Sequence, residues 1–399
     1  MSFDPQTLLK QAKWTGSPAL AELCDALGEN NIRWVGGAIR DTLLGEDVQD
    51  VDCATKLLPD TVIDLCRKAG IRTVPTGIEH GTVTAIFDDG PVEITTLRHD
   101  VSTDGRRATV SFAEDWQEDA ARRDFTINAL YAHPVTLEVS DYFGGLDDLA
   151  ARRVHFIGDA RTRIREDHLR ILRYFRFQAR FGAEADHEAE EACAELAATI
   201  KGLSRERIAM ELLAILSLPD PAPTIEHMHH LGVAQVILPE TGRDMIAHLA
   251  QLVSREKAYE LPVDAIRRLA ALLPALPETA GDVAARLRLS RAQRAKLVSL
   301  AERTPLDCGH PRALAYAEGM ENAFGRILLQ GGDVSSLNGW QAPELPLKGG
   351  EIVARGVSAG PEVARILRQV EARWIDEGFP DRDRVLALLQ EELPNAQFS

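Results

Sequence analysis

Residues 32–55, which read IRWVGGAIRDTLLGEDVQDVDCAT, contain the pattern that decides the fold of the first third of the chain. The apolar run at residues 32–35 predicts a strand, and the two glycines after it predict a turn into a helix over residues 38–44. Residues 51–54 predict a second strand. A strand, a glycine turn, a helix and another strand in this order indicate an α/β domain.

Two further β-rich runs, at residues 82–87 and 92–97, continue this pattern. The residues between them, Asp88, Asp89, Gly90 and Pro91, have the turn chemistry of a hairpin. We therefore expect these two strands to be antiparallel neighbours in the sheet of the α/β domain.

Strand signals end near residue 161, and helical patterns replace them. Apolar residues recur at three- and four-residue spacing in residues 161–181, 187–200 and 205–216, and Ser204 is the expected N-cap of the third helix. The remainder, to residue 399, is rich in alanine, leucine, arginine and glutamate and is interrupted by prolines. The sequence thus predicts an α/β head followed by an all-α body.

The composition is that of an ordinary globular protein. Of 399 residues, 45% are hydrophobic and 27% are charged, which excludes collagen-like, disordered and membrane classes. The formal net charge is -16, so the chain is not basic throughout, although a local basic face for nucleic acid is compatible with that value. The five cysteines form no CxxC pair and the first residues show no signal-peptide pattern, so a cytoplasmic location is expected.

Gly36, Gly37 and Arg40 form a candidate phosphate site. Glycines between a strand and a helix let the backbone approach a ligand, and the N–H groups at the start of the helix favour an anion. Arg40, one turn into the helix, is placed to pair with a phosphate. The alternative is that the glycines serve only the turn.

Asp50 and Asp52 are the candidate metal ligands. Residues i and i+2 of a strand point to one face, so these carboxylates are expected to converge, and a divalent cation would relieve their repulsion. Mg²⁺ prefers such oxygen ligands together with substrate phosphates. Glu93, on a neighbouring predicted strand, is a candidate third carboxylate, and two metal ions held this way suit in-line phosphoryl transfer. The alternatives are an acidic loop end for the two aspartates and a solvent-facing position for Glu93.

Arg123, Asp124 and Asn128, in the run RRDFTIN at residues 122–128, are candidates for nucleotide binding. Arginine binds phosphate, whereas aspartate and asparagine bond ribose hydroxyls. The alternative is a solvated helix start, in which Asp124 favours the positive end of the helix dipole.

Residues 166–177, which read EDHLRILRYFRF, are the most informative stretch. Asp167, Arg170, Arg173 and Arg176 recur every three residues, which on one helix is a drift of about 60° per step across one side. Residues 151–180 hold nine arginines and three acidic residues, a local charge of +6. An exposed helix with ion pairs would account for Asp167 and Arg170, but it leaves the other arginines without partners in the stretch.

Six runs follow one another between about residues 30 and 215: WVGGAIRD, QDVDCAT, RRDFTINAL, YFGGLDDL, EDHLRILRYFRF and SRERI. In these motifs the chain resembles the class II tRNA nucleotidyltransferases, the CCA-adding enzymes, and their bacterial poly(A) polymerase relatives. The resemblance implies an α/β nucleotidyltransferase head of the DNA polymerase β superfamily type over residues 1–155. It also implies a helical neck for the nucleotide base and RNA over residues 156–217, and a tRNA-binding helical body and tail over residues 218–399.

The resemblance also assigns expected roles to individual residues. Glu206 and Arg207 match a neck motif that braces the base-reading helix, and residues 96–116 resemble the flexible loop of full CCA-adding members. The expected roles are metal binding for Asp50 and Asp52 with Glu93 as third carboxylate, triphosphate binding at Gly37 and Arg40, and phosphate and ribose binding for Arg123 and Asp124. Base reading is expected of Asp167 and Arg170, with Arg173 and Arg176 beside them on the nucleotide.

The base-reading role has a physical reason. Cytosine and adenine each present an exocyclic amine beside a ring-nitrogen acceptor, so a carboxylate such as Asp167 accepts from the amine and a guanidinium such as Arg170 donates to the ring nitrogen. Uracil and guanine present a carbonyl and a ring N–H there instead. Each unpaired buried polar group costs about 1–3 kcal/mol, so two mismatches exclude U and G without a nucleic-acid template.

The function predicted from the sequence is therefore addition of C, C and A to tRNA 3′ ends from CTP and ATP, with Mg²⁺ and release of pyrophosphate. Two alternatives stay open. One is a bacterial poly(A) polymerase, although such members tend to have basic extensions and this C-terminus, EELPNAQFS, is acidic. The other is a non-catalytic relative that binds RNA or nucleotide, for which the Asp50 and Asp52 pair would have no use. The sequence indicates no membrane partner and does not predict the oligomeric state.

Overall fold

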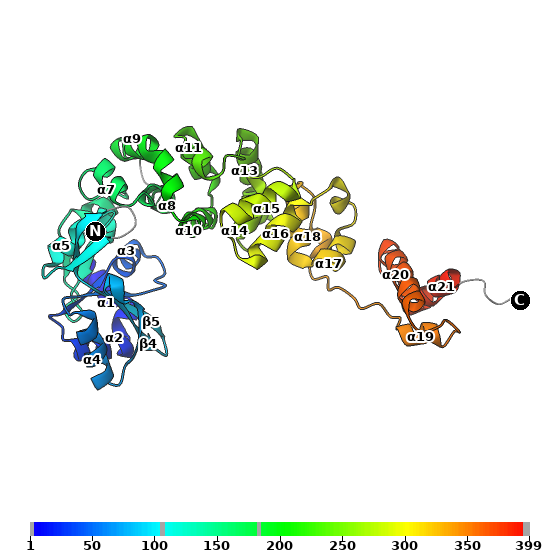
Figure 1. Cartoon of the computed structure of the whole chain (residues 1–399), viewed down its shortest axis with the longest axis horizontal. Helices are drawn as coiled ribbons and strands as arrows, with labels where there is room; N and C mark the ends of the chain where they lie inside the picture. Colours follow the sequence, from blue (N-terminus) through cyan, green and yellow to red (C-terminus); the bar gives the residue numbers. More distant parts are fainter. Residues whose placement is uncertain (1–3, 104–107, 182–184, 394–399) are drawn as a thin grey trace, which may run out of the picture. The chain divides into compact units, whose positions relative to one another are not determined.

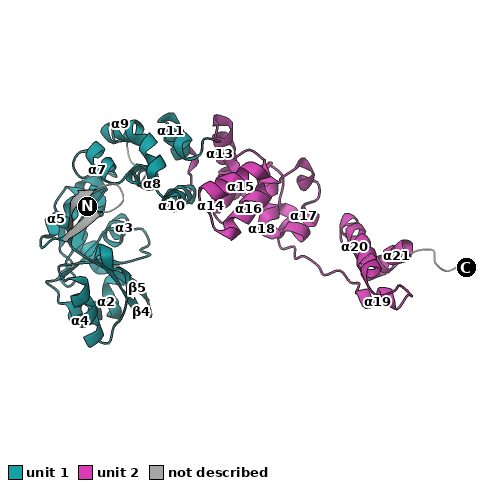
Figure 2. Cartoon of the chain, in the orientation of Figure 1, with its two compact units in different colours: residues 1–218, 223–239 teal, residues 219–222, 240–399 magenta. Residues whose placement is uncertain are grey.

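The computed structural model describes residues 4–103, 108–181 and 185–393 (Figure 1). The chain forms two compact units, drawn in different colours in Figure 2. Unit 1 comprises residues 1–218 and 223–239, and unit 2 comprises residues 219–222 and 240–399. The predicted α/β head and helical neck both lie within unit 1, whereas the boundary between them at residue 155 stays a prediction.

A mixed seven-stranded sheet forms the centre of the head, in the order β3-β4-β5-β2-β1-β8-β9. β2 and β5 are parallel, and the other neighbouring pairs are antiparallel. A separate pair of strands, β6 and β7, follows β5 in the chain. The strands are β1 (Ile32–Val35), β2 (Asp52–Thr55), β3 (Arg72–Gly77), β4 (Thr82–Phe87), β5 (Gly90–Thr96), β6 (Arg98–Thr103), β7 (Ala108–Phe112), β8 (Leu130–Ala132) and β9 (Val139–Asp141).

The predicted elements of the head are confirmed, with small shifts at their ends. The first strand is β1, the helix after the glycine turn is α3 (Gly37–Leu44), and the predicted hairpin is the pair β4 and β5. The second strand begins at Asp52, one residue later than predicted. Gly36 has a φ of 75°, in the left-handed region that favours glycine, so the turn itself requires this residue.

Helices cover one face of the sheet, and α5 (Trp116–Ala121) lies against the other. α4 (Pro59–Lys68) packs on β3 and β4, and α3 packs on β1 and β8. On the opposite face Val35, Ala54 and Tyr131 form an apolar cluster with Trp116. The other helices before the neck are α1 (Pro5–Gln11), η1 (Lys13–Gly16), α2 (Pro18–Leu27), η2 (Ile78–His80), η3 (Thr126–Asn128) and α6 (Gly145–Ala150).

The helices after the head begin as the sequence predicts, with one correction. The helix expected over residues 161–181 is two helices, because α7 ends at Glu166 and α8 begins at Arg170. Asp167 between them has an extended backbone, and its Oδ1 accepts a hydrogen bond from the N–H of Leu169 at 3.1 Å. These helices are α7 (Ala160–Glu166), α8 (Arg170–Phe181), α9 (His187–Leu196), η4 (Ala197–Gly202), α10 (Arg205–Leu216), α11 (Ala222–His230) and α12 (Val233–Ile237).

An aromatic cluster joins the head to these helices within unit 1. Phe125 of the head lies 4.8 Å from the Phe156 ring and 5.5 Å from the Phe177 ring of α8, measured between ring centroids. Phe156 also stacks on Tyr174 of α8 at 5.9 Å. Because Phe125 and Tyr174 are almost completely buried, α8 is held firmly beside the segment that contains Arg123 and Asp124.

Unit 2 is built from helices in its described residues. Buried Glu256 accepts from the Nε atoms of Arg267 and Arg268 at 2.7 and 2.8 Å, and a second core surrounds Trp374. Its elements are α13 (Arg243–Ala258), α14 (Ala265–Ala271), α15 (Pro277–Arg286), α16 (Arg291–Ala301), η5 (Pro305–Cys308), α17 (Pro311–Glu318), α18 (Met320–Leu329), η6 (Ser335–Leu337), α19 (Gly349–Val353), α20 (Pro361–Asp376) and α21 (Arg382–Glu392).

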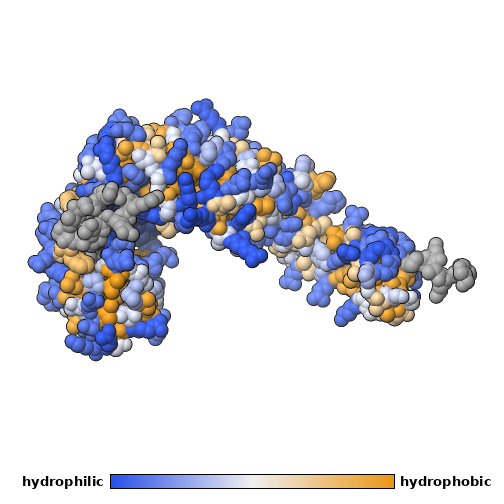
Figure 3. Space-filling model, in the orientation of Figure 1, coloured by the Kyte–Doolittle hydropathy of each residue, from blue (hydrophilic) through white to orange (hydrophobic). Residues whose placement is uncertain are grey.

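The visible surface of both units is mainly hydrophilic, with apolar residues in smaller separate patches (Figure 3). Among the described residues, no helix has both the length and the apolar character needed to cross a membrane.

Candidate active site

A cavity of about 310 Å³ in unit 1 brings the strand ends of the head together with the start of α8. It contains seven of the residues predicted from the sequence, which come from four separate segments of the chain. The lining residues are Val35, Asp52, Cys53, Glu93, Thr95, Arg98, Arg122, Arg123, Asp124, Asp167, Arg170 and Arg173.

Asp52 and Glu93 are neighbours across two parallel strands. Asp52 of β2 is in register with Glu93 of β5, and residues opposite one another on paired strands point to the same face. Burial, the charge of Glu93 and the charge of Asp50 raise the pKa of Asp52, against the opposing effect of Arg123. The two carboxylates therefore repel each other at the cavity, which is the situation that a bound cation relieves.

Asp50 does not line this cavity. It precedes β2 rather than lying on it, and it lines an adjacent hollow of about 830 Å³. Among the described residues, no three histidine, cysteine, aspartate or glutamate side chains are grouped closely enough to hold a metal by themselves. Asp52 and Glu93 offer the oxygen atoms that Mg²⁺ prefers, whereas Asp50 lies in the other hollow, so the assignment of all three as metal ligands stays a prediction.

Arg123 is held beside these carboxylates by a buried network. Its Nε donates to the Tyr131 hydroxyl at 2.9 Å, and its Nη2 lies 3.4 Å from Asp119 Oδ2. A Cβ on Gly36 would lie 3.5 Å from Arg123 Nη1, so the turn passes close over this guanidinium. Arg123 thus lines the cavity, whereas Gly36 does not, and the predicted phosphate contact of Arg123 stays a prediction.

Gly37, Arg40 and Asn128 also lie outside the cavity lining. Arg40 is 5% exposed, its Nη1 donates to Asn128 Oδ1, and its guanidinium lies 4.9 Å from the centre of the Phe177 ring. Its Nε donates to Asp41 at 2.8 Å. In this structure Arg40 and Asn128 therefore bind each other, and the predicted contact of Arg40 with triphosphate stays a prediction.

Asp124 links the head to α8. Its Oδ2 accepts from Arg173 Nε at 2.6 Å, and its Oδ1 accepts from Asn128 Nδ2 at 3.0 Å. Burial alone would raise the pKa of Asp124, but the charge of Arg173 and the hydrogen bonds outweigh burial and lower it. Asp124 is therefore a buried carboxylate that stays ionised and fixes Arg173 at the cavity wall.

Asp167 and Arg170 both line the cavity, but they do not pair with each other. Arg170 Nη1 donates to Glu166 at 2.6 Å, and its Nη2 donates to the carbonyl of Arg122 at 2.8 Å. Asp167 Oδ2 accepts from Arg207 Nη2 at 2.7 Å. The ion pair considered for Asp167 and Arg170 is thus wrong, because each has a separate partner that fixes its orientation at the cavity.

The other arginines of α8 have partners from distant segments. Arg176 Nε donates to buried Glu211 of α10 at 2.7 Å, and Arg180 lies 3.2 Å from Asp41. The expectation that the further arginines lack partners is therefore wrong, because Arg173, Arg176 and Arg180 each pair with a carboxylate from another segment. Arg176 does not line the cavity, and its guanidinium lies 4.5 Å from the Phe177 ring centre.

Sequence reasoning missed Arg98 and Arg122 as cavity residues. Arg98 is the first residue of β6, and its Nη1 donates to the His80 carbonyl at 2.7 Å. Arg122 directly precedes Arg123 in the quoted RRDFTIN run, so a doubled arginine was the available signal. Residues 104–107 of the expected flexible loop lie outside the described residues, and β6 and β7 flank them.

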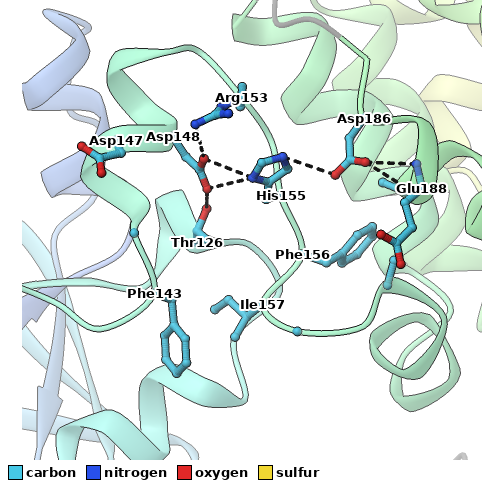
Figure 4. Close-up of a pocket in the computed structure, with 14 residues that line it drawn as sticks. Thr126, Phe143, Asp147, Asp148, Arg153, His155, Phe156, Ile157, Asp186 and Glu188 are labelled. Atoms are coloured by element: carbon cyan, nitrogen blue, oxygen red, sulfur yellow. Dashed lines mark hydrogen bonds and ion pairs between the residues drawn. The ribbon is translucent and has the colours of Figure 1, made fainter.

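A second set of contacts supports the 122–128 segment at another pocket, which Thr126, Asp148 and His155 line (Figure 4). Thr126 Oγ1 donates to Asp148 Oδ2 at 2.7 Å, and Asp148 also contacts His155 Nδ1 at 3.1 Å. A Cβ on Gly145 would overlap the Thr126 carbonyl, so the YFGGLDDL run approaches this segment as closely as its glycine allows. The cavity residues Arg123 and Asp124 thus lie on a rigid support.

Two family models match the chain. The model described as "Poly A polymerase head domain" matches residues 32–155, which contain the seven-stranded sheet and the cavity residues Asp52, Glu93 and Asp124. The model described as "Probable RNA and SrmB- binding site of polymerase A" matches residues 184–245.

Curated relatives match nearly the whole chain. CCA tRNA nucleotidyltransferase 1, mitochondrial, from Mus musculus is 34% identical over 400 residues, which cover 94% of this chain and 90% of the relative. A CCA-adding enzyme from Streptococcus sanguinis (strain SK36) is 33% identical over 386 residues, which cover 90% of this chain and 93% of the relative.

Solved structures share the fold at lower identity. The CCA-adding enzyme of Bacillus stearothermophilus in complex with CTP has a TM-score of 0.70 and 24% identity, over 94% of this chain and 98% of that one. The Thermotoga maritima CCA-adding enzyme complexed with tRNA_CCA has a TM-score of 0.71 and 20% identity, over 98% of both chains.

Proposed function

The chain belongs to the CCA-adding enzyme family of tRNA nucleotidyltransferases, and on that premise we propose that it adds C, C and A to the 3′ end of tRNA from CTP and ATP. The observation that carries the proposal is one cavity in which Asp52 and Glu93 lie together with Asp167 and Arg170. Such a cavity joins carboxylates suited to phosphoryl transfer with a carboxylate and a guanidinium suited to reading a base.

The reaction is a substitution at phosphorus. The 3′ hydroxyl of the RNA attacks the α-phosphorus of the nucleoside triphosphate, a new P–O bond forms, and pyrophosphate leaves with the electrons of the broken bond. Glu93, an exposed carboxylate beside Asp52, is placed to accept the hydroxyl proton. Arg123 and Arg173 are placed to hold the phosphates in line.

Mg²⁺ is the proposed metal, held by Asp50 and Asp52 with Glu93 beside them. When bound, it would neutralise charge on the phosphates and favour ionisation of the attacking hydroxyl. The support for this assignment is the raised pKa of Asp52, caused by burial and then by Glu93, because repelling carboxylates favour a cation between them.

Asp167 and Arg170 are the proposed base readers. Arg207 holds one oxygen of Asp167, and Glu166 with the Arg122 carbonyl holds Arg170, so both groups are fixed before a nucleotide binds. A carboxylate oxygen accepts more than one hydrogen bond, so Asp167 keeps capacity for an exocyclic amine. Fixed polarity of this kind selects C and A over U and G.

The tRNA is proposed to bind the neck and the helices of unit 2. The proposed neck spans residues 156–217, and the proposed body and tail span residues 218–399. An acidic chain binds RNA through local basic groups. Residues 151–180 carry a charge of +6, and exposed Arg165 of α7 supports this proposal, whereas Arg170, Arg173 and Arg176 are paired with acidic side chains. A cytoplasmic location belongs to the same proposal, since all five cysteines are free thiols and four of them are buried.

The test is incorporation of radiolabelled CTP and ATP into tRNA that lacks its CCA end, with the product sequenced. Addition of C, C and A in that order is the expected result. Untemplated runs of A on any RNA would instead identify a poly(A) polymerase, and binding of nucleotide without incorporation would identify a non-catalytic relative.

A further inference from the structure

Asp119 is a buried carboxylate next to the cavity whose place in the site no motif predicted. It lies on α5, is 1% exposed, and does not itself line the cavity. Its Oδ1 accepts from Arg122 Nε at 2.8 Å, and its Oδ2 accepts from the Tyr131 hydroxyl at 2.6 Å and lies 3.4 Å from Arg123 Nη2. One carboxylate therefore contacts both arginines of the RRDFTIN run.

The charges of this group do not cancel. Burial would raise the pKa of Asp119, but the charges of Arg123 and Arg122 outweigh burial and lower it, so the carboxylate is ionised. One negative charge then faces two guanidinium groups, and both of these line the cavity. Both guanidinium groups line the cavity beside Asp52 and Glu93, so a phosphate bound there would meet two cations whose orientation Asp119 fixes.

Tyr131 completes the geometry. Its hydroxyl donates to Asp119 and accepts from Arg123 Nε at 2.9 Å, so it connects the carboxylate to the guanidinium. The side chain is 0% exposed, and its ring lies edge-on to Trp116 at 6.0 Å and to Tyr142 at 6.1 Å between centroids. A phenol fixed on both sides gives Arg123 only one favourable orientation.

The same cluster reaches the base readers through the backbone. The carbonyl of Arg122 accepts from Arg170 Nη2 at 2.8 Å, and the side chain of Arg122 is fixed on Asp119. That contact uses the backbone of Arg122, whereas Asp119 holds its side chain, so replacing Asp119 should leave the partner of Arg170 in place. Asp119 reaches Arg123 more directly, through the single hydroxyl of Tyr131.

We propose that Asp119 and Tyr131 are positioning residues that hold Arg122 and Arg123 in the orientation that receives the phosphates of the incoming nucleotide. This inference rests on the proposed function, since it assigns phosphate to Arg123. Neither residue touches the nucleotide in this scheme, and both act through the guanidinium groups. Their loss should therefore weaken binding of nucleoside triphosphate without changing which base is preferred.

The test uses Tyr131→Phe, which keeps the ring packing and removes only the hydroxyl, and Asp119→Asn, which removes the charge. Calorimetric titration of the full chain with CTP and with cytidine separates phosphate binding from base binding. We expect CTP affinity to fall about tenfold in both variants, because each loses a hydrogen bond to a charged group. Cytidine, which has no phosphate, should bind within twofold of the parent.

A mutant cycle shows whether the effect passes through Arg123. In an Arg123→Ala background, Tyr131→Phe should cost no further CTP affinity, since coupled residues are not additive. Tyr316→Phe is the matched control, because Tyr316 also donates to a carboxylate, Glu371, at 2.7 Å but lies in unit 2. It should leave CTP affinity unchanged.

Three results would overturn the proposal: CTP affinity within twofold of the parent in Tyr131→Phe, an equal loss for CTP and cytidine, or a full additional loss in the Arg123→Ala background. Each is measured as binding, without turnover. A parent that binds CTP but fails to extend tRNA would refute the proposed function while leaving the positioning result intact.

Discussion

Arg207 Nη2 donates to Asp167 Oδ2 at 2.7 Å, across 40 residues of sequence. Arg207 lies in the first turn of α10, and Asp167 lies between α7 and α8, so the pair ties two neck elements at the cavity. The N–H of Leu169 holds the other oxygen of Asp167. The carboxylate is therefore oriented from both sides, which a base reader requires.

Removing this brace should affect selectivity more than stability. Both side chains are partly exposed, so the pair contributes little to folding. We expect Arg207→Ala to lower the preference for CTP over UTP by about tenfold, because Asp167 is then free to turn away from the exocyclic amine. The preference for CTP over UTP is measured by competition between the four triphosphates in single-nucleotide incorporation. The control is Arg205→Ala, which removes a nearby charge of the same helix. Unchanged selectivity in Arg207→Ala would show that the pair of Arg207 and Asp167 does not determine which base is chosen.

Replacing Asp50 or Asp52 by alanine should abolish incorporation while leaving the fold intact. Burial, Glu93 and Asp50 raise the pKa of Asp52, so this carboxylate is unfavourable in the absence of a cation. Its removal should leave the melting temperature unchanged or slightly higher. Radiolabelled CTP incorporation and thermal unfolding measure the two effects. Activity within tenfold of the parent in both variants would contradict the metal-ligand assignment.

The meeting of Asp52 and Glu93 at one cavity was predictable from the sequence, whereas the position of Asp50 off the strand and the arginine network were not. Spacing along one strand suggested Asp52, and Glu93 followed from a neighbouring strand. The partners of Arg173 and Arg176, by contrast, lie 49 and 35 residues away, so no local pattern could identify them. Tertiary packing also decided the burial of Arg40 against Phe177, which the phosphate expectation did not foresee.

The fold shows the same division. Alternating apolar residues and turn chemistry predicted β1, α3 and the β4–β5 hairpin, because these signals are local. The break at Asp167 was missed because the helical periodicity of the sequence continues through this residue. In the structure, the Asp167 carboxylate accepts a hydrogen bond from the Leu169 N–H, and the helical backbone is interrupted there.

The stability of unit 1 should depend on pH through Asp124. Its pKa is lowered in the folded state, so its contribution is present above the unfolded value near 3.8 and is lost as pH falls through the lower folded value. We expect Asp124→Asn to melt well below the parent at pH 7 and by a smaller margin at pH 3, which lies below the unfolded pKa. Thermal unfolding of both proteins at the two pH values is the measurement. A difference in melting temperature that does not narrow in acid would refute the ionised pair with Arg173.

Binding of tRNA should weaken steeply with salt. The chain has a net charge of -16, so RNA must dock on local basic groups and release counterions from its phosphates. We expect affinity to fall by at least about a hundredfold between 50 and 200 mM salt, in a filter-binding titration with tRNA lacking its CCA end. Equal affinity at both salt concentrations would exclude electrostatic docking on the neck.

Base choice gives the sharpest test of Asp167 and Arg170. Arg170→Ala should weaken incorporation of C and A together, because both bases offer a ring-nitrogen acceptor to the same guanidinium. It should also destabilise unit 1 by about 1–3 kcal/mol, since it leaves the Arg122 carbonyl without its buried donor, whereas Glu166 keeps Arg163. Folding and selectivity are therefore measured on the same sample.

Exchanging the two polarities separates base reading from stability. In Asp167→Arg with Arg170→Asp, the donor and acceptor change places, so U and G should gain relative to C and A even if absolute rates are low. The exchange also sets a carboxylate beside Glu166 and a second guanidinium beside Arg207, two like-charge contacts that will slow the enzyme. Relative incorporation of the four nucleotides is thus the informative quantity, and rate is not. A folded double variant that prefers CTP and ATP as strongly as the parent would show that other residues read the base.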